Sequence, residues 1–192
     1  KELNKPILID AFTDWCGPCK MLDKDVFQDD QAASYINENF VAYKLDMEKG
    51  EGPAVAMKFR VKAYPSTLFL SADGYLLTKK IGFPQKEGYL SWCKEVADNK
   101  YEPYKNLKAS NLNLEFPEFY KKSFTSDKWK RSRPNVKMIN EYLASQNSED
   151  LFNEVNWAVI SVFSRYQHKQ LNWVLKNKKQ LASLYPKSEI DD

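Results

Sequence analysis

Hydrophobic and polar positions in the first half of the chain alternate between short strand-like runs and helix-like stretches. The run Pro-Ile-Leu-Ile-Asp-Ala-Phe over residues 6–12 is apolar and rich in branched side chains, which predicts a buried strand. A helix is predicted to follow residue 16 and to loosen near Phe27, and acceptors at 28–30 are expected to cap a second helix over 31–39. A strand over 40–46 and a helix over 53–59 complete a strand–helix–strand–helix order.

The next apolar runs change the expected sheet from parallel to mixed. Residues 67–71 and 75–81 are strand-like and are separated by Ala-Asp-Gly at 72–74, which is a hairpin signal. A helix over 84–99 closes this unit, and its apolar face includes Cys93. Cys93 is therefore predicted to be a buried core residue, with a regulatory or partner-bonded thiol as the alternative. The whole order predicts an α/β fold with a mixed central sheet flanked by helices.

Beyond a polar stretch over 99–110, which is predicted to be a linker, apolar residues recur with helical spacing. The four segments concerned are 115–124, 134–144, 148–166 and 169–185. Ser148 is the expected cap of the third segment. The sequence thus predicts an α-helical C-terminal extension over residues 101–192. Similar Leu-Asn-Trp and Val-Asn-Trp-Ala phrases leave a helical-repeat array open, although no clean period of about 34 residues is present.

Composition and charge narrow the classes of function. The 192 residues are 43% hydrophobic, which predicts a packed globular protein, and no apolar run is long enough to span a membrane. Residues 101–192 hold 15 Lys and Arg against 11 Asp and Glu, whereas residues 1–100 hold 14 against 15. Neither balance demands a nucleic-acid or membrane partner. The basic stretch over 121–133 is predicted to be a solvated loop.

The candidate chemistry lies in Asp-Trp-Cys-Gly-Pro-Cys-Lys over residues 14–20, where the first strand becomes a helix. Pro18 suits the first helical turn, and the backbone N–H groups there stabilise a thiolate on Cys16, which lowers its pKa below the usual value. Cys16 is therefore the expected nucleophile and Cys19, one turn later, the resolving thiol. A zinc site needs four ligands, and the chain adds only Cys93 and a predicted surface histidine, His168.

Two segments carry a resemblance to a known family. Trp-Cys-Gly-Pro-Cys-Lys after Ile-Leu-Ile-Asp resembles the active-site segment of the thioredoxin family, and Ala-Tyr-Pro-Ser-Thr over 63–67 is similar to its cis-proline segment. Gly82 resembles the family's later glycine. Within the family, residues 12–14 and 25–29 resemble the carboxy-terminal domains of membrane thiol:disulfide interchange proteins. The resemblance covers about residues 5–98, and it implies a thioredoxin-like domain over 1–100 that is N-terminally incomplete.

The resemblance also implies roles for individual residues. Asp10 would be the buried acid that takes a proton from Cys19, with Lys44 on the neighbouring strand tuning its charge; a solvated Asp10 on a shorter strand is the alternative. Pro65 would be cis, so that the Tyr64 backbone can pair with an extended substrate. Trp15 would shield the dithiol, although plain packing also explains it. Gly17-Pro18 resembles the dipeptide of reducing thioredoxins.

These expectations converge on a thiol–disulfide oxidoreductase that reduces protein disulfides. It would need no bound cofactor, because electrons would arrive from an upstream dithiol protein. A disulfide isomerase or oxidant is one alternative, and a redox-sensing interaction protein whose extension binds a partner is another. The likeness to the interchange-protein branch implies a periplasmic or other extracytoplasmic location, with the cytoplasm as the alternative.

Overall fold

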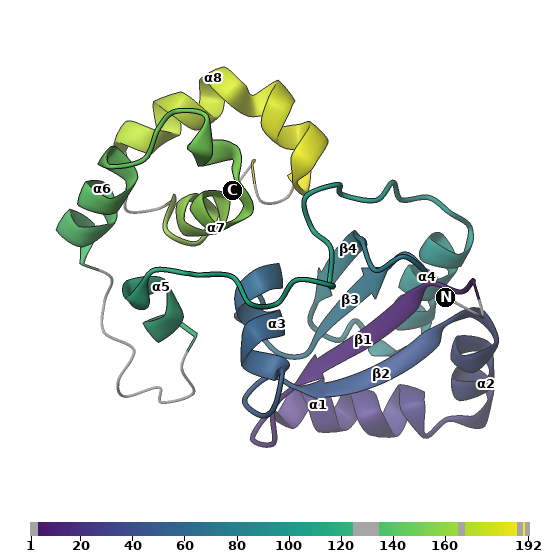
Figure 1. Cartoon of the computed structure of the whole chain (residues 1–192). Coiled ribbons are helices and arrows are strands. Elements are labelled where there is room, and N and C mark those ends of the chain that lie inside the picture. The colour runs from purple at the N-terminus through teal and green to yellow at the C-terminus, as the bar shows by residue number, and fades with distance from the viewer. Residues whose placement is uncertain (1–3, 125–134, 165–167, 188–189, 191–192) are drawn as a thin grey trace.

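A four-stranded mixed sheet carries the first half of the chain (Figure 1). Its strands are β1 (Ile7–Phe12), β2 (Val41–Asp46), β3 (Ser66–Leu70) and β4 (Leu76–Ile81), in the order β2-β1-β3-β4. β1 pairs in parallel with β2 and antiparallel with β3, and β3 and β4 form the predicted hairpin. The computed structural model describes residues 4–124, 135–164, 168–187 and 190.

Five helical elements accompany the sheet in residues 4–100. They are α1 (Gly17–Leu22), a π-helical turn η1 (Asp23–Phe27), α2 (Asp30–Asn39), α3 (Gly52–Phe59) and α4 (Gln85–Ala97). The π-helical turn confirms the predicted loosening near Phe27. Asp29 caps α2, because its carboxylate accepts a hydrogen bond from the Ala32 N–H at 2.9 Å.

Alternating side chains on the strands send two sets of apolar residues to opposite faces of the sheet. Leu8 and Phe69 belong to the core formed with α1, α2 and α4, whereas Ile9 and Leu68 belong to the core formed with α3. Figure 1 shows α1 and α2 along one side of the sheet and α3 on the other. Cys93 is fully buried in the first core, as predicted, and burial raises the pKa of its thiol to about 12.

The segment after α4 is bound to the sheet and does not behave as a simple linker. Leu76 N donates to Leu107 O at 2.8 Å, and Tyr104 N donates to Leu76 O at 2.9 Å. Tyr75 forms an isolated antiparallel bridge with Lys108. The polar composition of residues 99–110 gave no sign of this pairing, because backbone groups make the bonds.

Helical segments follow in the second half of the chain. They are α5 (Glu118–Lys122), α6 (Val136–Ala144), a 3-10 turn η2 (Asp150–Phe152), α7 (Glu154–Val162) and α8 (His168–Leu184). The prediction of one helix over 148–166 capped by Ser148 is wrong. Asn153 interrupts it and caps α7, because its side chain accepts from the Asn156 N–H at 2.8 Å. None of the described helices has the length and apolar character needed to cross a bilayer.

The extension and the α3 face of the sheet share one apolar core. Buried residues of the extension, including Tyr120, Trp157 and Tyr185, belong to the same cluster as Ile9 and Phe59. Figure 1 shows α6, α7 and α8 gathered on the α3 side of the molecule. Most of the basic stretch over 121–133 and the exposure of the His168 side chain lie outside the described residues, as do residue 134 and residues 165–166 of two predicted helices.

Candidate active site: a disulfide beside a cis-proline

Cys16 and Cys19 lie where β1 gives way to α1, and they form a disulfide with their Cα atoms 5.3 Å apart. Cys16 is the N-cap residue of α1, and its Sγ accepts a hydrogen bond from the Cys19 N–H at 3.1 Å. Both cysteines are buried, while Gly17 and Pro18 between them are exposed. The sulfur of Cys16 therefore meets a backbone donor and the positive end of the helix, which favour a thiolate once the disulfide opens.

The segment before β3 contacts the residue that precedes this pair. The Tyr64–Pro65 peptide bond is cis, as the resemblance implies. The ring of Tyr64 packs edge to face against Trp15, with 5.9 Å between the ring centroids. Trp15 is 47% exposed, so it contacts Tyr64 with only part of its surface. The residue before Cys16 and the residue before the cis-proline are thus in direct contact.

Asp10 lies in the middle of β1, between Lys44 on β2 and Thr67 on β3. It is 2% exposed, and neither of its carboxylate oxygens has a hydrogen-bond partner among the described residues. Burial raises the pKa of this carboxyl from 3.8 to about 6, the charge of Lys44 opposes the rise, and the charge of Asp23 adds to it. The alternative of a solvated Asp10 on a shorter strand is wrong.

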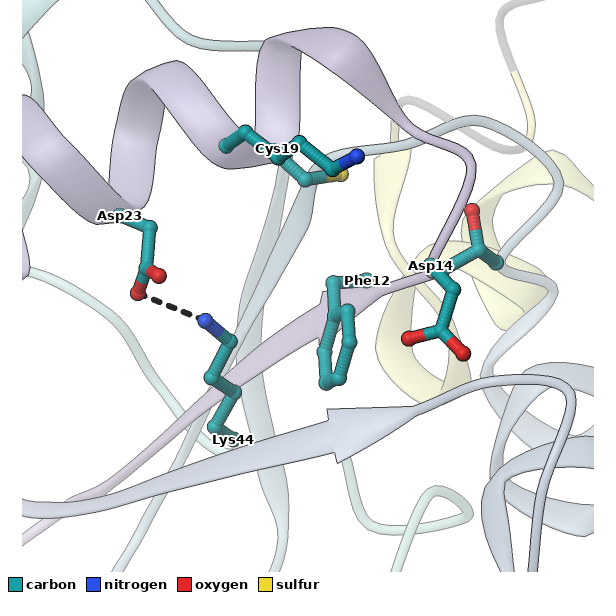
Figure 2. A pocket seen from close by; sticks show the side chains of 7 residues that line it. Phe12, Asp14, Cys19, Asp23 and Lys44 are labelled. Atoms are coloured by element: carbon teal, nitrogen blue, oxygen red, sulfur yellow. Dashed lines mark hydrogen bonds and ion pairs between the residues drawn. The ribbon is translucent and has the colours of Figure 1, made fainter.

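A cavity of about 200 Å³ opens beside Cys19 (Figure 2). It is lined by Phe12, Thr13, Asp14, Cys19, Lys20, Asp23 and Lys44. Figure 2 shows Lys44 reaching from β2 toward Asp23 on η1, and the Lys44 Nζ lies 2.6 Å from the Asp23 Oδ1. Lys44 therefore divides its charge between Asp10 and Asp23. Sequence reasoning missed Asp23, although its position four residues after Cys19 is a usable signal.

The turn after β2 holds the active-site segment from the other side. Trp15 Nε1 donates to Glu48 Oε1 at 2.9 Å, and Asp14 forms an ion pair with Lys49. Sequence reasoning missed these contacts as well, because nothing local in residues 46–51 marks them as neighbours of the dithiol. They hold the indole of Trp15 next to Tyr64, so the indole has a packing role. That it also shields the dithiol stays a prediction.

A strand that carries a buried carboxyl and delivers a disulfide to a helix N-terminus, together with a cis-proline whose preceding residue contacts Trp15, defines the class of thioredoxin-fold dithiol proteins. A family model described as a thioredoxin-like domain matches residues 1–97. The thioredoxin of Rickettsia felis is 30% identical over 91 residues, which cover 47% of this chain and 81% of that protein. The thioredoxin of Mycobacterium tuberculosis is 32% identical over 96 residues, which cover 50% and 78% of the two chains.

The chain therefore belongs to the thioredoxin-like family, and its Cys-x-x-Cys pair is that of a thiol–disulfide oxidoreductase. Among solved structures, a putative disulphide-isomerase from Bacteroides thetaiotaomicron is 41% identical, with a TM-score of 0.45. That match covers 49% of this chain and 78% of the other. The family match ends at residue 97, so the helical extension lies beyond it.

Proposed function

We propose that this protein reduces disulfides in protein substrates and is itself oxidised to the Cys16–Cys19 disulfide. The observation that supports this proposal best is the burial of Asp10 without a hydrogen-bond partner in the described residues, on the strand that leads to the dithiol. Burying a carboxyl without a hydrogen-bond partner lowers the stability of the folded protein, and a residue with only a structural role would not need to be a carboxyl. A role in moving a proton accounts for that cost.

The reaction begins with the reduced pair. The Cys16 thiolate attacks one sulfur of the substrate disulfide, a new S–S bond joins Cys16 to the substrate, and the other substrate sulfur leaves as a thiolate that takes a proton from water. An extended substrate segment pairs with the backbone of Tyr64 during this step, and Pro65, which has no backbone N–H, offers no competing donor there. Trp15 offers an apolar contact next to the pair.

Asp10 acts in the second step. Its carboxylate accepts the proton of the Cys19 thiol, and the resulting thiolate attacks Cys16. The Cys16–Cys19 bond forms, the bond to the substrate breaks, and the second substrate sulfur leaves as a thiolate that takes a proton from water, while Asp10 releases the proton it accepted back to water. In total, two electrons and two protons pass to the substrate. An upstream dithiol protein restores the reduced pair by the reverse exchange, so no bound cofactor takes part.

The direction of exchange follows from the reduction potential of the pair. Gly17-Pro18 favours a reductase, for which we expect a reduction potential of about −270 mV, as in thioredoxin. The measurement is an equilibrium titration of the purified protein in dithiol redox buffers, followed by Trp15 fluorescence. A value of about −180 mV or higher would instead assign the protein to isomerisation or oxidation.

A trapping experiment tests the assigned roles of the two cysteines. Replacing Cys19 with serine removes the resolving thiol, so we expect mixed disulfides between Cys16 and several client proteins to accumulate. The matched Cys16→Ser variant should trap none of them. Capture of one fixed partner alone would favour a redox-sensing interaction protein. An extracytoplasmic location stays a prediction, and fractionation of the source cells tests it.

A further inference from the structure

The connection between α3 and β3 ends in the cis-proline, and through Tyr64 it contacts Trp15, the residue before Cys16. Val61 and Pro65 in this connection are buried, whereas Lys62 and Ala63 are exposed and Tyr64 is half-buried. A substrate segment that pairs with the Tyr64 backbone must run along this exposed stretch. The conformation of residues 62–64 before binding therefore affects how tightly a substrate binds.

The extension holds the chain immediately before this stretch. Tyr120 in α5 donates its hydroxyl hydrogen to the Met57 carbonyl at 2.7 Å. Tyr185, which follows α8, lies under the Arg60 guanidinium, 5.9 Å from ring centroid to Cζ. Arg60 also has a left-handed backbone conformation, with φ at +54°, at the end of α3. The extension thus fixes the point from which the exposed stretch leaves the helix.

One contact reaches the exposed stretch itself. The Lys62 Nζ lies 5.4 Å from the ring centroid of Phe124 and 5.9 Å from that of Phe163. Both rings pack against Tyr120, at centroid distances of 5.0 and 6.3 Å. Phe163 is buried, so this aromatic cluster (Tyr120, Phe124 and Phe163) is a fixed part of the extension. The Lys62 ammonium is within the range at which aromatic rings attract a cation.

We propose that the aromatic cluster of the extension, acting through Lys62, holds residues 62–64 ready to pair with a substrate and so determines the affinity for disulfide-bearing protein segments. Lys62 is a positioning residue in this scheme, because it acts through the backbone of Tyr64 and not on the sulfurs. The inference rests on the proposed function, and it assigns the extension a part in substrate binding. A small disulfide, which has no backbone to pair, does not need this support.

The test compares a protein substrate with a small disulfide in the full-length chain. In the Lys62→Gln variant we expect KM for a protein substrate to rise about three- to fivefold, the gain expected from one or two cation–ring contacts. The kcat, the rate with hydroxyethyl disulfide and the reduction potential should stay unchanged, and the urea unfolding midpoint should fall only slightly. KM is measured in whichever redox direction the potential assigns, so the result stands even if the reductase proposal fails.

Matched variants separate this scheme from its rivals. Lys62→Arg keeps a cation over the rings and should restore the KM, whereas Lys105→Gln removes another exposed lysine charge and should have no effect. Phe124→Leu should raise KM like Lys62→Gln, and the double variant should be no worse than either single one. An unchanged KM in Phe124→Leu, or an equal rise in Lys105→Gln, overturns the inference.

Discussion

Two buried ionisable side chains, one on each side of the sheet, differ in whether they have a partner. Asp10 is 2% exposed and its carboxylate has no hydrogen-bond partner among the described residues. Lys58 in α3 is 1% exposed, but it forms an ion pair with Glu154 of α7, with its Nζ 2.8 Å from Oε1 and 3.0 Å from Oε2. The active-site side tolerates an isolated buried charge, whereas the extension side supplies a partner.

This difference suits the two roles: Asp10 is proposed to transfer a proton, whereas Lys58 stabilises the fold. An unpaired buried carboxyl changes its protonation near neutral pH, which is useful for proton transfer and costly for stability. A buried lysine that is paired with a carboxylate on another element ties the two elements together, so this ion pair links α3 to the extension. Burial raises the pKa of Glu154, and the hydrogen bond and charge of Lys58 oppose that rise. Four predictions test this contrast, in order of decreasing effect.

The largest effect is expected from breaking the ion pair. Glu154→Leu would leave the Lys58 ammonium buried without its partner, which should cost about 3–5 kcal/mol in the free energy of unfolding. Urea denaturation of the full chain measures the loss. The double variant Lys58→Met/Glu154→Leu should recover most of it, since a buried ion pair can be replaced by apolar side chains with little penalty. A loss below about 1 kcal/mol in the single variant would contradict the linking role.

Removing the unpaired charge should have the opposite sign. The pKa of Asp10 is raised to about 6 in the folded state, so its contribution to stability is complete below the unfolded value of 3.8 and is lost as pH rises through about 6. Asp10→Asn should therefore unfold less readily than the natural chain at pH 8, by roughly 2–3 kcal/mol. Urea unfolding at pH 4 and pH 8 measures this difference, which should be much smaller at the lower pH.

The same substitution should impair the reaction. Turnover of Asp10→Asn at neutral pH should fall by up to about a hundredfold, because the Cys19 proton loses its acceptor. The pH dependence of turnover in the natural chain should show a step near the Asp10 pKa, and the step should be absent from the variant. A variant that is more stable yet equally active would contradict the role of the Asp10 carboxyl in proton transfer.

The smallest effect concerns Asp23, which competes with Asp10 for Lys44. Its negative charge raises the pKa of Asp10, so Asp23→Asn should move the step in the pH–rate profile to lower pH. The matched control is Asp25→Asn, which removes an exposed carboxylate from the same π-helical turn. The other groups that face Asp10 are Thr67 on β3 and Tyr89 on α4, and they are unchanged in both variants. Equal profiles for the two variants would exclude a particular influence of Asp23.

Local patterns predicted the strands, the hairpin and the dithiol, because each depends on residues close together in the sequence. The cap of α2 at Asp29 and the burial of Cys93 are examples. The break at Asn153 was missed because the apolar spacing of residues 151–162 continues across it. The Asn153 side chain accepts a hydrogen bond from the N–H three residues later, and this cap begins a new helix despite the continuing periodicity.

The partners of the site could not be predicted in the same way. The Glu48 bond to Trp15 and the approach of Lys62 to Phe124 join segments far apart in the sequence. In the sequence, Glu48 and Lys62 look like ordinary surface charges, which are common along the chain. Asp10 and Lys44 were placed correctly because strand pairing brings them to the same register, whereas Asp23 required the geometry of η1.

The contact between Lys58 and Glu154 spans 96 residues, and this separation has a consequence for folding kinetics. Closing so long a loop costs chain entropy before the contact contributes any stabilisation, so we expect the pair to form after the sheet has assembled. A contact made late in folding acts mainly on the rate of unfolding. The pair should then act as a latch that sets how long the folded molecule survives, while the rate at which it folds is set elsewhere.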